Sequence, residues 1–107
     1  MREIYKRKKR YFEEVDCFLL EIKKIVREKF PDAEVFLFGS VVEGNYSIGL
    51  SDIDVAIVSD VFQNRELELD LYEKLTERFL DSPFEFHLLT KKIWEYYKRF
   101  IKKYRSI

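Results

Sequence analysis

The hydrophobic residues of this chain recur at two spacings, the first of which is that of amphipathic helices. Over residues 11–30, 65–80 and 91 to about 104, apolar side chains recur every three or four positions, which predicts three helices that each bury one face. Pro31 ends the first helix because proline disfavours helical geometry in the residue before it, and the Asp-Ser-Pro segment at 81–83 breaks the second. Thr90 can cap the third, in which the aromatic residues are expected to pack in the core.

The second spacing is that of strands. Residues 34–38 are rich in β-branched and aromatic side chains, and residues 52–58 form an apolar run typical of a central strand buried on both faces. In residues 84–90, alternation places Phe84, Phe86 and Leu88 on one face and Glu85, His87 and Leu89 on the other. With a short helix over 41–43, the predicted order is helix, strand, short helix, strand, helix, strand, helix.

Length and composition indicate one globular domain over residues 1–107. The chain is 47% hydrophobic and 37% charged, which is enough apolar material for a core, but it is too short for a separate substrate-binding domain. Lys, Arg and Glu are abundant, whereas Gln occurs once and Asn twice, a bias that fits a protein from a hot environment.

The net charge is zero, but the two ends are basic. Residues 1–10 contain six basic residues and one acidic residue, and residues 91–107 contain seven basic residues and one acidic residue. Such ends could contact RNA or an acidic partner, although a charge run is most often a solvated face. The single cysteine, Cys17, excludes an internal disulfide and a cysteine-based zinc site. We expect a cytoplasmic protein with no membrane contact, because no apolar stretch resembles a signal peptide or a transmembrane span.

The residues that suggest chemistry lie between the first two predicted strands. Gly39 ends the first strand where the backbone must turn sharply or approach a ligand, and Ser40 can cap the short helix, whose N-terminus would favour phosphate. Asp52 and Asp54 lie two residues apart, hence on one face of the second strand, where a shared divalent cation would relieve their repulsion. Two aspartates spaced in this way, without other signals, more often lie at a solvent-exposed strand end. The preceding Gly39-Ser40 instead favours a site for a metal-bound nucleoside triphosphate.

The run GSVVEGNYSIGLSDIDVAIV (residues 39–58) resembles the signature of the nucleotidyltransferase superfamily that includes DNA polymerase beta. The small size makes the chain similar to the minimal nucleotidyltransferases of archaea and bacteria, which are often paired with HEPN proteins. The motif covers about a sixth of the chain, and the element order matches over nearly all of it. The fold that this resemblance implies is α+β, close to α/β, with a small mixed sheet of three to four strands flanked by helices.

The resemblance also implies roles for particular residues. Gly39 and Ser40 would bind the triphosphate of ATP or another nucleoside triphosphate. Asp52 and Asp54 would be catalytic ligands of two Mg²⁺ ions, with Mn²⁺ as an alternative, and Glu85 would be the third carboxylate, which binds one metal and helps to activate the attacking hydroxyl. Two such ions suit an in-line displacement at the α-phosphate.

Three further residues bear on how the site would work. His87 lies on the face of Glu85, where it could orient that carboxylate, contact substrate or be a hydrogen-bonded structural histidine. Val41 and Glu43 occupy positions where many minimal members have arginine, which weakens the expectation of tight triphosphate binding.

Several functions are compatible with these features. The first is transfer of a nucleoside monophosphate, most plausibly AMP from ATP, to a hydroxyl of a partner protein, as the antitoxin of a HEPN/MNT toxin–antitoxin pair. The alternative is an inactive nucleotidyltransferase-fold module that binds a partner protein or RNA. Transfer to a small molecule such as an aminoglycoside is disfavoured because little chain remains to build a pocket. Aromatic and leucine residues on the helices could also be buried in an interface between copies of the chain, so a homo-oligomer is a further alternative.

Overall fold

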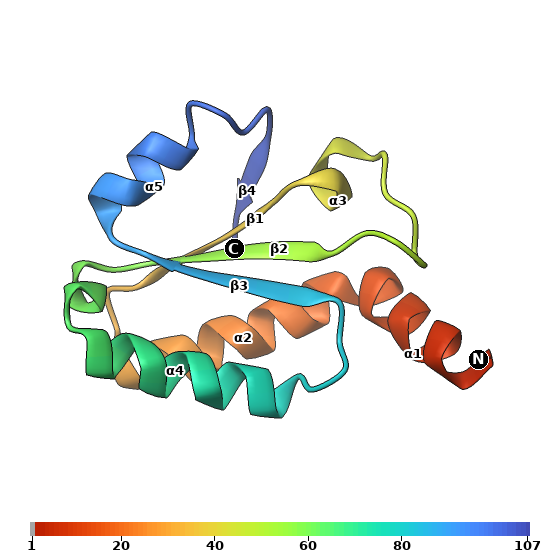
Figure 1. Cartoon of the computed structure of the whole chain (residues 1–107), viewed down its shortest axis with the longest axis horizontal. Coiled ribbons are helices and arrows are strands. Elements are labelled where there is room, and N and C mark those ends of the chain that lie inside the picture. Colours follow the sequence, from red (N-terminus) through yellow and green to blue (C-terminus); the bar gives the residue numbers. More distant parts are fainter. Residues whose placement is uncertain (1) are drawn as a thin grey trace.

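The protein is described here by a computed structural model, in which residues 2–107 are placed (Figure 1). The helices are α1 (Arg2–Glu13), α2 (Val15–Lys29), α3 (Ser40–Glu43), the 3-10 helix η1 (Asp60–Gln63), α4 (Arg65–Arg78) and α5 (Lys91–Tyr97). The strands are β1 (Glu34–Phe38), β2 (Ile53–Val58), β3 (Phe84–Leu89) and β4 (Tyr104–Ser106). No helix in this part of the chain is long and apolar enough to cross a membrane.

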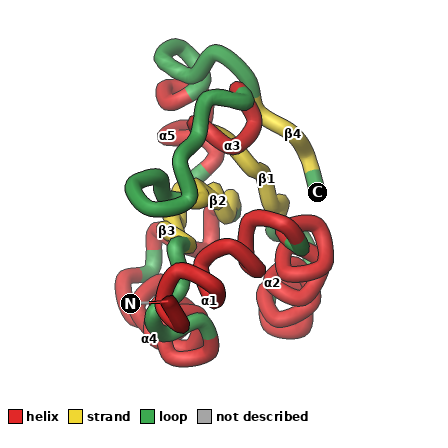
Figure 2. The backbone as a smooth tube through the Cα atoms, turned by 90° about the vertical axis from the view of Figure 1, so that its right-hand side faces the viewer, coloured by secondary structure: helices red, strands yellow, loops and turns green. Residues whose placement is uncertain are grey.

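The four strands form one mixed sheet in the order β3-β2-β1-β4. β1 pairs with β2 and β4 in antiparallel fashion, and β2 pairs with β3 in parallel. Helices α2 and α4 lie on one face of the sheet, and α3 and α5 lie on the other (Figures 1 and 2). The predicted α+β fold with a small mixed sheet is therefore confirmed.

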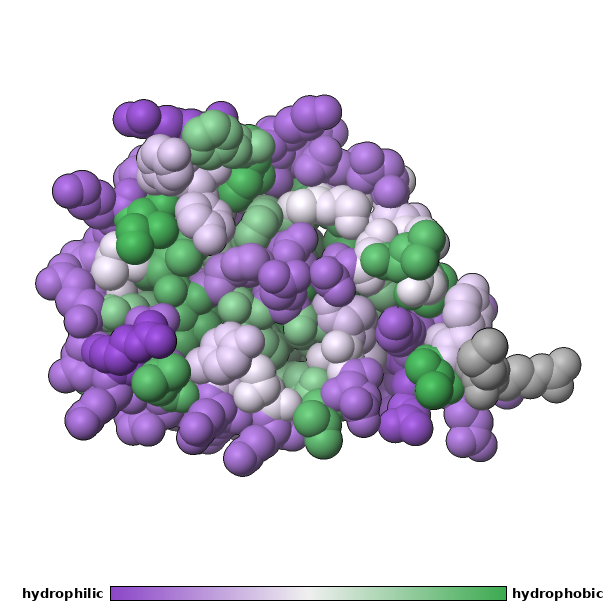
Figure 3. Space-filling view, in the orientation of Figure 1, coloured by the Kyte–Doolittle hydropathy of each residue, from purple (hydrophilic) through white to green (hydrophobic). Residues whose placement is uncertain are grey.

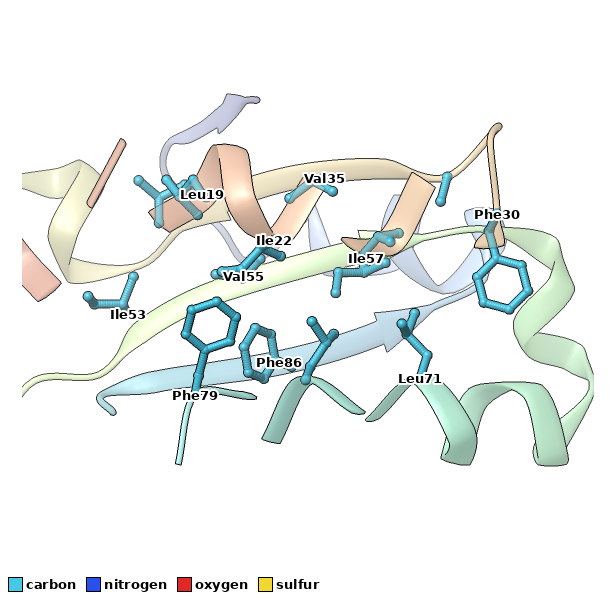
Figure 4. Packing of buried hydrophobic residues seen from close by; sticks show 14 of the residues in the cluster. Leu19, Ile22, Phe30, Val35, Ile53, Val55, Ile57, Leu71, Phe79 and Phe86 are labelled. Carbon is cyan, nitrogen blue, oxygen red and sulfur yellow. The ribbon is translucent and has the colours of Figure 1, made fainter. Parts of the chain in front are cut away.

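Alternation along β2 divides its side chains between two cores. Val55 and Ile57 face α2 and α4, where they belong to the larger cluster shown in Figure 4. Ala56 and Val58 face α5 and belong to a smaller cluster around Trp94. Both sets are almost fully buried, so the prediction of a central strand buried on both faces is confirmed.

The first predicted helix, over residues 11–30, is two helices in the structure. Helix α1 already begins at Arg2, and the chain bends at Glu14 before α2. The ring of Phe12 stacks on that of Tyr46 at a centroid distance of 5.0 Å, and Phe12 joins Leu19, Ile22 and Val26 of α2 in the main core. The start of α1 was not predicted because it buries no apolar stripe: hydrophobic side chains there, such as Ile4, are exposed. The sequence of this segment shows only a run of charged residues.

The last predicted helix is also shorter than expected. Thr90 caps α5 as predicted, by accepting a hydrogen bond from the N–H of Ile93 at 3.4 Å. The helix ends at Tyr97 rather than near Tyr104. Only part of the predicted aromatic stripe is packed, since Trp94 is buried but Phe100, which lies beyond the end of α5, is 73% exposed.

The residues after α5 form a strand that local spacing does not predict. The segment from Tyr104 to Ser106 pairs with residues 36–38 of β1, and the N–H of Ile107 donates to the carbonyl of Val35 at 2.9 Å. Pairing satisfies backbone groups along the otherwise open edge of β1. This pairing with β1 competes with helix formation in residues 98–104 and prevails. Local spacing does not reveal it, because β1 is distant in the sequence.

Candidate functional site

The parallel pairing of β2 with β3 brings the predicted acidic residues together. In this register Asp54 lies opposite Glu85, and Ala56 lies opposite His87. On its other side, Asp54 lies opposite Phe38 of β1. The site thus sits where β2 and β3 begin and β1 ends, on the sheet face that α3 and α5 flank. In Figure 3, which has the orientation of Figure 1, hydrophilic side chains lie in the middle of the view, over β2 and β3.

Three donor groups form a tight cluster. The Nε2 atom of His87 lies 3.2 Å from Oδ1 of Asp54, within hydrogen-bond distance, and 3.9 Å from Oε1 of Glu85. One donor atom from each of the three residues falls within 4.8 Å of the others, a spacing that a single metal ion could bridge. The side chains of Asp54 and His87 are 23% and 20% exposed, so solvent or a ligand can reach them.

Asp52 lies just before β2 and joins the cluster through Glu85. The pKa of Glu85 is raised, chiefly because the carboxyl is partly desolvated and next because its protonated form hydrogen-bonds to the side chain of Asp52. The negative charges of Asp54 and Asp52 raise this pKa further, and His87 opposes them. Three carboxyl groups therefore lie close together. A cation bound among them would reduce the repulsion that protonation of Glu85 otherwise reduces.

Gly39 is required by its contact with Asp54. Its backbone has φ +85°, and a Cβ atom at this position would lie 2.4 Å from Oδ2 of Asp54. The predicted sharp turn is present, and the group that the backbone approaches is the carboxylate of Asp54. The glycine thus brings the start of α3 close to the acidic cluster.

The expected capping role of Ser40 is wrong. Gly39 is the N-cap of α3, its carbonyl accepts hydrogen bonds from the N–H groups of Val42 and Glu43 at 3.1 Å each, and no side chain caps this helix. Ser40 is instead the first helical residue, because Gly39, with its positive φ, completes the turn one residue earlier than the sequence suggests. Val41, at a position where arginine is common, packs against the main core.

Two aromatic neighbours of the site were missed by sequence reasoning. The ring of His87 lies 5.2 Å from that of Phe38 and 6.1 Å from that of Tyr97, measured between centroids. Phe38 could have been found from its place directly before Gly39. Tyr97 could not, because only the packing of α5 on the sheet brings it near His87.

A Gly-Ser turn, aspartates at the start of the neighbouring strand and an acidic residue on the next parallel strand are the features on which the resemblance to the nucleotidyltransferase superfamily rests. The sequence profile of the nucleotidyltransferase domain matches residues 19–107, and the chain belongs to this family. A search of proteins with curated functional descriptions gave no match.

Two solved structures are similar. One is the crystal structure of a candidate nucleotidyltransferase that is 61% identical, covers 84% of this chain and 97% of its own, and superposes with a TM-score of 0.77. The other is a candidate nucleotidyltransferase from Sulfolobus solfataricus with 23% identity, coverage of 96% and 84%, and a TM-score of 0.55, which shows the shared fold.

Proposed function

We propose that this protein is a metal-dependent nucleotidyltransferase that transfers a nucleoside monophosphate, AMP from ATP, to a hydroxyl group of a partner protein. The observation that carries the proposal is the gathering of three carboxylates at one end of the sheet. Asp54 and Glu85 are opposite residues of two paired strands, and Asp52 is near enough to help raise the pKa of Glu85. Membership of the nucleotidyltransferase domain family supports the reaction class.

The chemistry of the carboxylates fits the proposed metal. Asp52, Asp54 and Glu85 would hold Mg²⁺, which prefers oxygen ligands, and the bound ions would stabilise charge on the attacking and leaving oxygens. Glu85 is half-exposed at the edge of the cluster, so its carboxylate would hold one ion beside an incoming hydroxyl and help to position that hydroxyl for attack.

The turn at Gly39 would position the nucleotide. Because Gly39 packs directly on Asp54, a triphosphate bound by the hydroxyl and amide of Ser40 would lie beside the metal ligands. The chain would then act mainly by holding the α-phosphate in line with the attacking oxygen.

The acceptor is proposed to be a hydroxyl on a HEPN-type protein, with the present chain acting as antitoxin. This rests on the resemblance to minimal nucleotidyltransferases, which are often paired with HEPN proteins. The direct test incubates the protein with Mg²⁺, ATP radiolabelled at its α-phosphate, and HEPN proteins encoded by neighbouring genes. We expect label on the partner with the wild type, and none with Asp52→Asn or Asp54→Asn.

A matched control keeps this result interpretable. Asp70→Asn removes an exposed carboxylate from α4, on the opposite face of the sheet, and should transfer label like the wild type. Absence of label with every partner, from wild type and variants alike, would refute the transferase proposal.

A second candidate function is partner binding without catalysis. It is favoured by Val41, which packs against the main core at a position where arginine could contact phosphate, and by the acidic Glu43. Calorimetry separates the two candidates. An active site should bind ATP with Mg²⁺ and lose that binding in Asp54→Ala, whereas a pure binding module should bind its partner equally well in both forms and show no heat with ATP.

A further inference from the structure

We propose that His87 is a direct ligand of the metal ion, so that Asp54, Glu85 and His87 form a mixed nitrogen and oxygen site that prefers Mn²⁺ to Mg²⁺. This inference deepens the proposed function and rests on it for the presence of a metal. It differs from a site made of three carboxylates alone, because it assigns one coordination position to an imidazole nitrogen.

The distances between donor atoms support a shared ion. Adjacent ligands of an octahedral ion with bonds of about 2.1 Å lie about 3.0 Å apart, and opposite ligands lie about 4.2 Å apart. Nε2 of His87 lies 3.2 Å from Oδ1 of Asp54 and 3.9 Å from Oε1 of Glu85. The first separation is close to that of adjacent ligands and the second to that of opposite ligands. Donor atoms of all three groups lie within 4.8 Å of one another, so the groups stand near the positions of ligands to one ion.

The surroundings hold the imidazole in this orientation. Its ring lies against Phe38, with centroids 5.2 Å apart, and near Tyr97 at 6.1 Å. The strand neighbour opposite His87 is Ala56, which is fully buried and small. Packing on the apolar side thus leaves the Nε2 edge directed at two carboxylates, an arrangement that lowers the conformational cost of binding a cation.

A purely structural histidine explains less of this geometry. In such a residue Nε2 needs one hydrogen-bond partner, and Asp54 alone would supply it. The close approach to Glu85 would then serve no purpose in the hydrogen-bonding of the ring. In a metal site the same approach is required, because both carboxylates and the imidazole face the ion.

The chemical consequence is a change in metal preference. Mg²⁺ favours oxygen ligands in a strict octahedron, whereas imidazole nitrogen is a good ligand for first-row transition ions. Replacing one oxygen ligand by His87 should therefore strengthen the binding of Mn²⁺ relative to Mg²⁺. The partial exposure of all three side chains leaves the ion a route from solvent.

The test uses the fact that His87 is the only histidine in the chain. Untagged wild-type protein is loaded with MnCl₂ alone, and electron spin echo envelope modulation is recorded. Imidazole nitrogen coupling to Mn²⁺ can then come only from His87. We expect this coupling in the wild type, and we expect it to change to the ¹⁵N pattern in protein made with ¹⁵N-histidine, a control that needs no variant.

The matched variant is His87→Gln, whose amide can still donate a hydrogen bond to Asp54 and offers an oxygen to a hard cation. We expect its Mn²⁺ affinity to fall by about tenfold or more, and its Mg²⁺ affinity, measured by competition, to change by less than about threefold because an oxygen ligand remains. A positioning role for His87 predicts equal effects on both ions.

Each result decides the proposal separately from the transferase function. Mn²⁺ bound without imidazole coupling, or no Mn²⁺ binding by the wild type, would overturn the assignment of His87, while transfer of label with Mg²⁺ would leave the proposed function intact. Imidazole coupling in a protein that transfers no label would support the metal site and count against the transferase.

Discussion

Replacing Gly39 by alanine tests whether the turn into α3 is built around Asp54. The new Cβ would lie 2.4 Å from Oδ2 and 3.3 Å from Cγ of Asp54, so the carboxylate must move. The backbone, at φ +85° and ψ −159°, also lies in a region that is almost restricted to glycine.

The magnitude follows from these two costs. Backbone strain of this type costs about 1–3 kcal/mol, and a clash in a packed position adds about 1–3 kcal/mol. The sum, about 2–6 kcal/mol, should lower the Tm by about 8 °C or more, because each kcal/mol shifts the Tm of a domain near this size by about 4–8 °C.

The other two glycines separate the contributions. Gly44 also has a positive φ, +82°, but no atom lies within 4 Å of its hypothetical Cβ, so Gly44→Ala should cost only the backbone term, about 1–2 kcal/mol. Gly49 has neither constraint, and Gly49→Ala should change stability by less than about 0.5 kcal/mol.

The assay is thermal unfolding followed by circular dichroism, together with a double-mutant cycle. In an Asp54→Ala background, Gly39→Ala should lose its steric cost and approach the effect of Gly44→Ala. The reasoning is refuted if Gly39→Ala is no more destabilising than Gly44→Ala, or if its effect is the same with and without the Asp54 carboxylate.

Three further predictions concern charge, metal and packing. Because the pKa of Glu85 is raised in the folded state, its favourable contribution to metal-free stability is present below about pH 4.5 and is lost as pH rises through the folded pKa. Denaturant unfolding at several pH values should show that Glu85→Gln gains stability relative to the wild type at pH 8 but not at pH 4. Thermal unfolding with and without MgCl₂ should show stabilisation of the wild type that rises with Mg²⁺ concentration and is absent in Asp54→Asn. Trp94→Ala should cost about 3–5 kcal/mol in urea unfolding, because the indole is only 4% exposed and packs on Phe36 in the smaller core, whereas Ile93→Ala, at an exposed position of α5, should cost less than about 1 kcal/mol.

The candidate site was partly visible in the sequence because strand geometry has a period of two. That period alone places Glu85 and His87 on one face of β3, and the structure has them on one face. It could not show that Asp54 and Glu85 are opposite each other, because the register between β2 and β3 depends on packing of the whole sheet with α4. The close contact between Gly39 and Asp54 was likewise hidden, since their separation in space follows from the pairing of β1 with β2.

Local spacing predicts most of the helices and strands and the side chains that each presents to a face, because 3.6-residue and two-residue periodicities are local properties. Tertiary structure decided the bend at Glu14, the early end of α5 and the pairing of Tyr104–Ser106 with β1, which all depend on partners distant in the chain. It also decided which carboxylates meet, and that His87 joins them. These contacts form only when separate segments share one core, so no local pattern of residues encodes them.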